Sequence, residues 1–196
     1  MIWIITSPER IHEEEKILAD LLLAGAHHVL LRKPSWQQAD YLAFLDKTDP
    51  AWYPRIIIRD YPEAAARFGV GGLHLSADVR DNISQGDLQR FPLCSTGIHD
   101  TAAIAVMPPS FTVLLLSPVF NSISKAGYHG RFAQPLPDKN GKLVLALGGV
   151  DASNIHRLKA WQFDGAALLG AIWENPGKAV NTYQRIQSQW NSNDQS

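Results

Sequence analysis

Residues 143–154 read LVLALGGVDASN, a run of five apolar residues that meets two glycines and then a polar turn. The run does not alternate with polar residues, which is typical of a strand buried on both faces of a parallel sheet. Glycines at the end of such a strand leave the backbone amides of the turn open to close approach. The stretch therefore predicts a buried parallel strand that is followed by a turn with accessible backbone amides.

Seven further short apolar runs are spaced along the chain, and apolar residues recur at helical spacing between them. We expect helices to begin near Ser7–Pro8, Asp60, Asp100 and Asp151, because these residues are good N-caps or first-turn residues. The seven runs lie at 2–6, 28–32, 55–59, 71–75, 92–98, 112–116 and 165–169.

Eight strands that alternate with helices predict an α/β fold, a compact (β/α)8 TIM barrel. An open doubly wound sheet is the alternative, but it requires a glycine-rich turn after the first strand, and TSPERI (6–11) is not one. Residues 117–142 carry no good helix face, so we expect a long irregular loop after the sixth strand. Residues 1–190 are expected to form this single barrel and 191–196 a polar tail.

Composition narrows the class of partner. The chain has 18 basic and 19 acidic residues without a basic stripe, which disfavours nucleic acid. It has no apolar run long enough to cross a membrane, and MIWIITSPER (1–10) does not read as a secretory signal. The single cysteine, Cys94, is expected to be a buried thiol, which fits a reducing compartment. We therefore expect a cytoplasmic protein.

In a barrel of this kind the active site lies at the carboxyl ends of the strands. Gly148, Gly149 and Gly170 follow the last two strands, where such barrels bind phosphate, and a tight turn is the alternative explanation. Arg32 follows the second strand and is interpreted as an anion ligand rather than a surface ion pair. Asp60 follows the third strand and is explained by an N-cap role.

Two histidines occupy strand ends. His99 follows the fifth strand and titrates near neutral pH, which suits proton transfer. His74 lies between two leucines, and a hydrogen-bonded core histidine is as reasonable as a ligand contact. After the sixth strand, hydroxyls, one ammonium and glycines predict a loop that closes over an anion; its polar residues are Ser117, Ser122, Ser124 and Lys125.

The chain resembles the thiamine phosphate synthase and TenI-type thiazole tautomerase superfamily over nearly its whole length. The resemblance implies a compact β/α barrel that acts in thiamine biosynthesis. It rests on the order and spacing of VLLRKP (29–34), IIIRD (56–60), GVGGLHLS (69–76), STGIHD (95–100), SPVFNSISK (117–125), LALGGV (145–150) and LLGAI (168–172).

The synthase branch joins a pyrimidine diphosphate to a thiazole phosphate with magnesium. Its strand-two motif, Gln-x-Arg-x-Lys, falls on Leu30, Arg32 and Pro34, so only the arginine is kept. Its Asn-Asp pair becomes Arg59–Asp60, and its second magnesium carboxylate falls on Val79. The resemblance to this branch therefore implies a poor magnesium site.

The TenI-like branch resembles the chain better, and its enzyme isomerises a thiazole phosphate carboxylate tautomer to the aromatic form. The proton-shuttling histidine of this branch corresponds to His99. Where the branch often has a serine two residues before that histidine, this chain has Gly97. The thiazole phosphate contacts correspond to Gly148, Gly149, Gly170 and Ala171, and to the loop residues Ser122, Ser124 and Lys125.

We therefore expect a thiazole tautomerase that binds a phosphorylated thiazole and uses no metal or other cofactor. Thiamine phosphate synthase is the alternative among enzymes. A non-catalytic regulatory protein that binds thiazole or thiamine phosphate is the alternative from another class. Neither nucleic acid nor membrane is expected as a partner, and a homodimer remains open.

Overall fold

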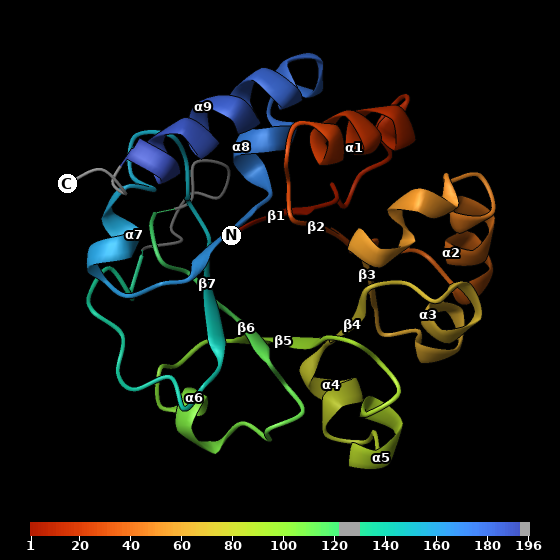
Figure 1. The fold of residues 1–196 in the computed structure, drawn as a ribbon, viewed down its shortest axis with the longest axis horizontal. Coiled ribbons are helices and arrows are strands. Elements are labelled where there is room, and N and C mark those ends of the chain that lie inside the picture. Colours follow the sequence, from red (N-terminus) through yellow and green to blue (C-terminus); the bar gives the residue numbers. More distant parts are fainter. Residues whose placement is uncertain (122–129, 193–196) are drawn as a thin grey trace.

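The computed structural model describes residues 1–121 and 130–192. Eight parallel strands pair in chain order, and β8 pairs with β1, which closes the barrel (Figure 1). The predicted (β/α)8 barrel is confirmed, and each strand falls within one of the apolar runs. The strands are β1 (Ile2–Ile5), β2 (His28–Leu31), β3 (Ile56–Arg59), β4 (Gly72–Leu75), β5 (Cys94–Ile98), β6 (Val113–Leu116), β7 (Leu143–Leu147) and β8 (Gly165–Leu168).

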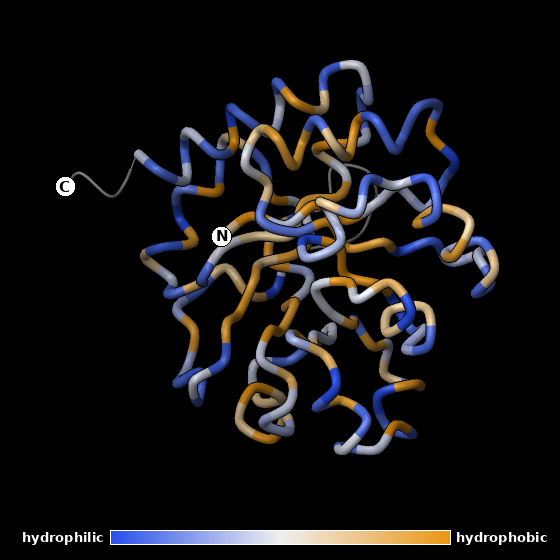
Figure 2. The backbone as a smooth tube through the Cα atoms, turned by 45° about the vertical axis from the view of Figure 1, so that its right-hand side comes forward, coloured by the Kyte–Doolittle hydropathy of each residue, from blue (hydrophilic) through white to orange (hydrophobic). Residues whose placement is uncertain are grey.

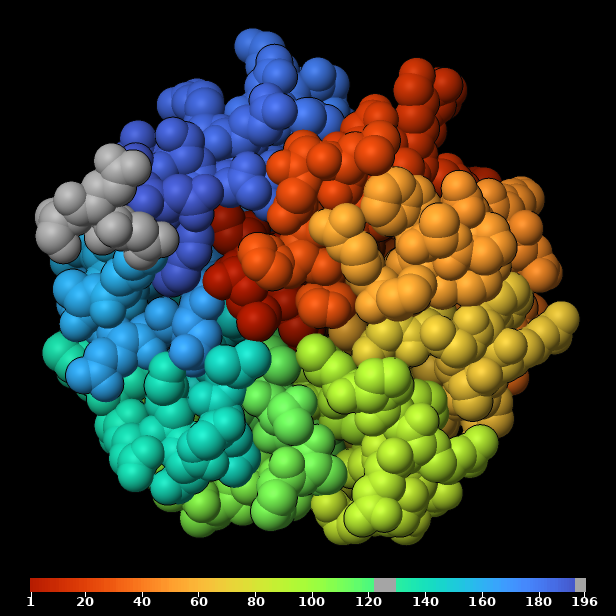
Figure 3. Space-filling view, viewed as in Figure 1, coloured from red at the N-terminus to blue at the C-terminus, as the bar shows by residue number. Residues whose placement is uncertain are grey.

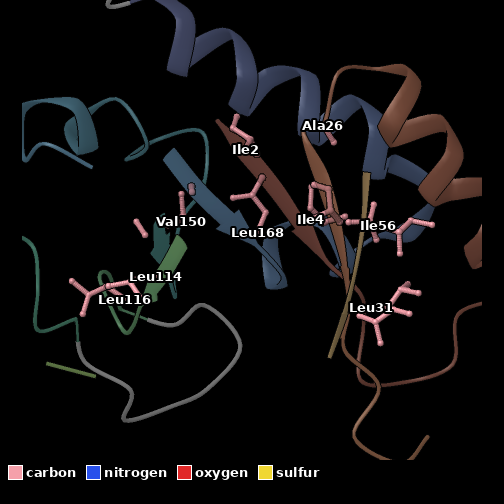
Figure 4. Packing of buried hydrophobic residues seen from close by; sticks show 14 of the residues in the cluster. Ile2, Ile4, Ala26, Leu31, Ile56, Leu114, Leu116, Val150 and Leu168 are labelled. Carbon is pink, nitrogen blue, oxygen red and sulfur yellow. The ribbon is translucent and has the colours of Figure 1, made fainter. Parts of the chain in front are cut away.

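Alternate residues of each strand face opposite sides of the barrel wall, which explains why the runs are apolar throughout. One set packs in the barrel interior and the other beneath the helices. Figure 4 shows members of the second set, among them Ile4, Leu31 and Ile56 on three adjacent strands. The interior set is Trp3, Ile5, Leu30, Ile57, Val113, Leu115, Leu145 and Ala167.

The helices form the outer layer, and several have only four residues, which is how 196 residues complete a barrel. The segments follow one another around the molecule in chain order (Figure 3), and apolar residues gather on its inner segments (Figure 2). The helices are α1 (Glu14–Leu23), α2 (Gln38–Leu45), α3 (Pro62–Phe68), α4 (Ala77–Arg80), α5 (Gln85–Leu88), α6 (Ala103–Val106), α7 (Arg157–Ala160), α8 (Gly170–Trp173) and α9 (Ala179–Asn191), with 3-10 turns η1 (Pro50–Arg55) and η2 (Pro176–Lys178).

The predicted helix starts are less accurate than the strands. The α1 helix begins at Glu14 rather than after Ser7, whose hydroxyl accepts a hydrogen bond from the Glu9 amide in a local turn. The α7 helix begins at Arg157 because residues 152–156 form turns after Asp151. In both places a short polar side chain stabilises a turn instead of starting a regular helix.

The connection after β6 is irregular wherever it is described, as predicted. A cis peptide joins Ser117 to Pro118. The next residues run alongside the end of β7, where the amides of Val119 and Phe120 donate to the carbonyls of Leu147 and Gly148. Residues 122–129 lie outside the described part of the chain.

Among the described residues, no helix is both long enough and apolar enough to cross a membrane.

Candidate active site

Two arginines point into the carboxyl end of the barrel from neighbouring strands. Leu30 and Ile57 are interior residues paired in register, so the next inward positions along β2 and β3 belong to Arg32 and Arg59. Residues in register on adjacent strands lie about 5 Å apart at their backbones. Burial and, secondarily, the charge of Arg59 lower the pKa of Arg32. The structure thus places two like charges side by side at the mouth.

Asp60 fixes the position of Arg59. The Asp60 Oδ2 atom lies 2.9 Å from Arg59 Nε, and Oδ1 accepts a 2.7 Å hydrogen bond from the Ser76 amide. The residue has a φ of 61°, and its amide donates to the His74 carbonyl. Its predicted role as a helix N-cap is wrong, because α3 is preceded by Tyr61. Asp60 instead joins the ends of β3 and β4.

Arg80 is a third arginine on this side, and the sequence analysis missed it. Its Nη1 lies 3.4 Å from Thr96 Oγ1 at β5, and its Nε donates to Asp81. Its position on a four-residue helix, one residue after Val79, gave no signal in the periodicity. A pattern of arginines after β2, β3 and β4 was the available clue.

His74 lies inside the barrel, which decides between the two readings of its strand. It is buried, and its Nδ1 is 2.9 Å from Ser95 Oγ on β5. Burial, followed by the charges of Arg59 and Arg32, lowers its pKa from 6.5 to about 3. His74 is therefore a neutral, hydrogen-bonded residue next to the arginines, as the core reading expected.

His99 is exposed at the ends of β5 and β6, where its ring is held by Ser117. The His99 Nδ1 is 2.9 Å from the Ser117 carbonyl oxygen and 3.2 Å from its Oγ. A carbonyl oxygen can only accept, so Nδ1 carries a proton, and in the neutral ring the lone pair is on Nε2. The arrangement gives an accessible proton acceptor with a fixed ring direction.

Gly149, after β7, has a structural role besides the predicted one. A Cβ on Gly149 would lie 2.1 Å from the Asn121 carbonyl oxygen, and its φ is 66°. The backbone after β6 thus occupies the Cβ side of Gly149, and this explains the glycine. Among the described residues, however, the amides of Gly149 and Val150 have no hydrogen-bond acceptor.

Gly170 and Ala171 begin α8 beside this edge. The Gly170 carbonyl accepts from the Glu174 amide, and Trp173 Nε1 donates to the Ile5 carbonyl at 2.7 Å, which ties α8 to β1. Ala171 also lines a polar cavity of about 550 Å3 between α8, α9 and residues 151–153. An apolar cavity of about 240 Å3 lies away from the mouth, between α1 and α2.

The loop residues Ser122, Ser124 and Lys125 lie outside the described residues. Lys33, next to Arg32, is not available to a ligand, since its ammonium forms a buried ion pair with Glu14 and donates to the Glu9 carbonyl. The described mouth therefore has arginines on one side and backbone amides on the other side. His99 lies on the rim between these two sides.

The residues at the mouth do not fit the magnesium ion of the synthase branch. Both carboxylate oxygens of Asp60 are engaged, and Val79 packs against the hydrophobic layer. Among the residues that the structure describes, no three His, Cys, Asp or Glu side chains are grouped to hold a metal. We therefore assign no step to a metal.

Solved structures with the same architecture include a thiamine phosphate pyrophosphorylase from Bacteroides thetaiotaomicron, with a TM-score of 0.76 and 20% identity over 96% of each chain. The chain shares its fold. A thiamine phosphate pyrophosphorylase from Pyrococcus furiosus has a TM-score of 0.72 and 13% identity over 96% of this chain and 94% of that one.

A phosphoribosyl anthranilate isomerase from Thermus thermophilus is also similar, with a TM-score of 0.57 and 15% identity over 96% of this chain and 98% of that one. No protein-family model matches the chain, and no curated protein sequence matches it either. At these identities the similarity establishes the barrel fold, and function has to be argued from the mouth.

Proposed function

We propose that this protein is a thiamine-biosynthesis enzyme that isomerises a thiazole phosphate carboxylate tautomer to its aromatic form. The observation that carries the proposal is the geometry of His99, whose Nδ1 is held by the Ser117 carbonyl, while Nε2 has no partner among the described residues and the side chain is exposed. The fold shared with two thiamine phosphate pyrophosphorylases supports the pathway. The poor fit to magnesium favours isomerisation over diphosphate chemistry.

The reaction moves one proton and leaves the composition of the substrate unchanged. His99 Nε2 takes a proton from a ring carbon, and the electron pair of the broken C–H bond enters the conjugated system. The imidazolium then returns the proton to the exocyclic carbon, which completes the aromatic ring. The Ser117 carbonyl stabilises the ring while it is protonated, because it accepts a hydrogen bond from Nδ1–H throughout.

We place the phosphate of the substrate at the β7–β8 side of the mouth. Within residues 1–121 and 130–192 the amides of Gly149 and Val150 have no acceptor, which supports this placement, because a phosphate is a natural acceptor for them. Gly170 and Ala171 are the neighbouring positions at the start of α8. Ser122, Ser124 and Lys125 are proposed as loop contacts on the basis of sequence alone.

Thiamine phosphate synthase is the second candidate function. The names of two similar structures favour it, and the arginines could face a diphosphate. It would have to work with Asp60 already paired to Arg59 and with Val79 in the core layer. These two features place it behind the tautomerase.

The test is to supply the purified protein with the thiazole tautomer alone, in chelator, and to follow the aromatic product by its ultraviolet absorbance. We expect product at a rate above that of the free solution. Product only from pyrimidine diphosphate plus thiazole phosphate with magnesium would replace the proposal by the synthase. Tight binding without turnover of any of these compounds would favour a regulatory binding protein.

We further propose a cytoplasmic location, because the buried Cys94 is the only cysteine of the chain. We also propose a homodimer, on the basis of the family resemblance alone. Measuring the molecular mass in solution tests this.

A further inference from the structure

The two inward-facing arginines at the ends of β2 and β3 are arranged as an anion site. Like charges directly opposite each other on neighbouring strands destabilise a sheet. Arg32 and Arg59 occupy such positions, since Leu30 pairs with Ile57 and Leu31 with Ile58. Negative charge nearby would relieve the repulsion between the two guanidiniums.

The described protein supplies only part of that charge. Asp60 pairs with Arg59 through Nε, and within the described residues no carboxylate lies within 4 Å of the Arg32 guanidinium. In the same part of the chain, neither the Arg32 guanidinium nor the terminal nitrogens of Arg59 donate to a protein group. The pair therefore retains one uncompensated positive charge and several free donors.

The local environment strengthens an interaction with an anion. The side chain of Arg59 is only 26% exposed, and Arg32 is partly buried. Ionic hydrogen bonds are stronger where water is partly excluded. Asp60 is itself held by the Ser76 amide, so the direction of the Arg59 guanidinium is fixed before a ligand arrives.

We propose that Arg59, oriented by Asp60 and next to Arg32, forms a metal-independent binding site for an oxyanion of the substrate. Its guanidiniums take the place of the divalent cation that the synthase branch of the resemblance implies. The ligand is a group with two or more oxygens that can accept paired N–H donors, which is a carboxylate or a diphosphate. Arg80 is not part of this site, since it pairs with Asp81 and contacts Thr96.

This inference rests on the proposed function and makes its substrate class more specific. In a closed barrel of eight strands, β3 and β7 are four strands apart and so lie on opposite sides of the mouth. A ligand with its phosphate at β7–β8 would place a second anionic group at β2–β3. The substrate class is then a small ring with two separated anionic groups.

The experiment measures binding by isothermal titration calorimetry with two probes, inorganic diphosphate and thiazole-2-carboxylate, each in chelator and in magnesium. We expect at least one probe to bind in chelator with an affinity that magnesium does not raise. A carboxylate preference identifies the tautomer as the source of the anion, and a diphosphate preference identifies a pyrimidine diphosphate. Binding of both probes only in magnesium would overturn the proposal.

The variants Arg59→Gln and Arg32→Gln are each expected to weaken the bound probe by roughly 10- to 100-fold, the range for a lost charged hydrogen bond. Arg67→Gln on the exposed surface of α3 is the matched control and should bind as the wild type. If Arg59→Gln does not fold by circular dichroism, Arg32→Gln decides, because Arg32 has no ion pair to lose. Unchanged affinity in the folded variants would refute the site.

The outcome separates this inference from the proposed function, because binding is measured without turnover. Chelator-resistant, arginine-dependent binding in a protein that does not isomerise the tautomer would keep the site and remove the function. Isomerisation with wild-type kinetics in both arginine variants would keep the function and remove the site.

Discussion

The β2–β3 side of the mouth is built from charged side chains, whereas the β7–β8 side is built from backbone. Arg32, Arg59 and Asp60 form the first side through ionic contacts. On the second side, Gly149 lies so close to the irregular segment after β6 that a Cβ would clash with it. Side-chain sites can be altered by substitution with little change in the backbone, but a backbone site depends on the path of the chain itself.

The largest effect should come from the residue between the two sides. β5 lies midway between β3 and β7, and His99 follows it. If the two sides hold the two ends of one substrate, His99→Asn should lower kcat by about 10²–10⁴-fold with KM nearly unchanged, because the amide cannot shuttle a proton. Steady-state kinetics on the thiazole tautomer measures this.

His12→Asn is the control for that prediction, since the side chain of His12 is 94% exposed. Wild-type turnover in His99→Asn together with an inactive His74→Asn would move the proton transfer to the buried histidine. Proton transfer would then no longer be assigned to a residue between the two sides of the mouth.

The backbone side can be tested through Gly149→Ala against Gly69→Ala. Both glycines have positive φ, 66° and 60°, but only at Gly149 would the new Cβ meet backbone atoms. We expect Gly69→Ala to cost about 1 kcal/mol of folding free energy, from strain alone, and Gly149→Ala roughly 2 kcal/mol more. Urea unfolding measures both.

Equal losses of unfolding free energy in the two alanine variants would show that the segment after β6 can shift at little energetic cost. Because Gly149 also provides an amide for the proposed phosphate, its variant should weaken phosphorylated ligands more than dephosphorylated ones. An equal loss for both kinds of ligand would argue against a phosphate at this edge.

The next effect concerns acid and the β2–β3 side of the mouth. The folded protein binds a proton at His74 only near pH 3, because burial and the arginines lower its pKa, whereas the unfolded chain binds it near 6.5. The unfolded state therefore takes up the proton first, and stability is complete above about pH 6.5 and falls as the pH decreases towards 3. The contribution of one such group is at most about 1.4 kcal/mol per pH unit.

His74→Asn should make the unfolding free energy less dependent on pH between 6.5 and 3, as measured by urea titrations at several pH values. Some dependence will remain, because burial also lowers the pKa of His28 to about 4. An unchanged slope in His74→Asn would mean that His74 is not a buried residue that stays neutral in the folded protein.

The smallest expected effect is that of a chelator, which should leave turnover of the tautomer unchanged. The reason is that Asp60 is paired and Val79 faces the core layer, so the rim offers guanidiniums instead of a metal site. Turnover measured before and after dialysis against chelator tests this. Loss in chelator and recovery with magnesium would show that the β2–β3 side works through a cation after all.

The sequence predicted the strands more accurately than the helix starts. Apolar runs such as 143–147 become strands because both of their faces are buried, and burial of that kind leaves a direct trace in composition. Asp151 precedes a helical pattern, but residues 152–156 form turns, since a short carboxylate stabilises a turn as readily as a helix end. Asp60 lies two residues before α3, and its carboxylate binds Arg59 and the Ser76 amide instead of capping the helix. The candidate site was predicted in outline, with His99 and the arginines at strand ends.

The sequence by itself determined the eight buried strands, their alternation with helices and the polar residues at their carboxyl ends. Only the tertiary structure decided that Arg32 and Arg59 lie side by side and that Asp60 pairs with Arg59. It also decided that the backbone after β6 packs so closely against Gly149 that a side chain would clash there. The physical reason is that whether a residue is buried depends largely on its own hydrophobicity, which the sequence gives directly. Pairing and close approach depend on register and on chain segments far apart in sequence, which hydrophobicity does not encode.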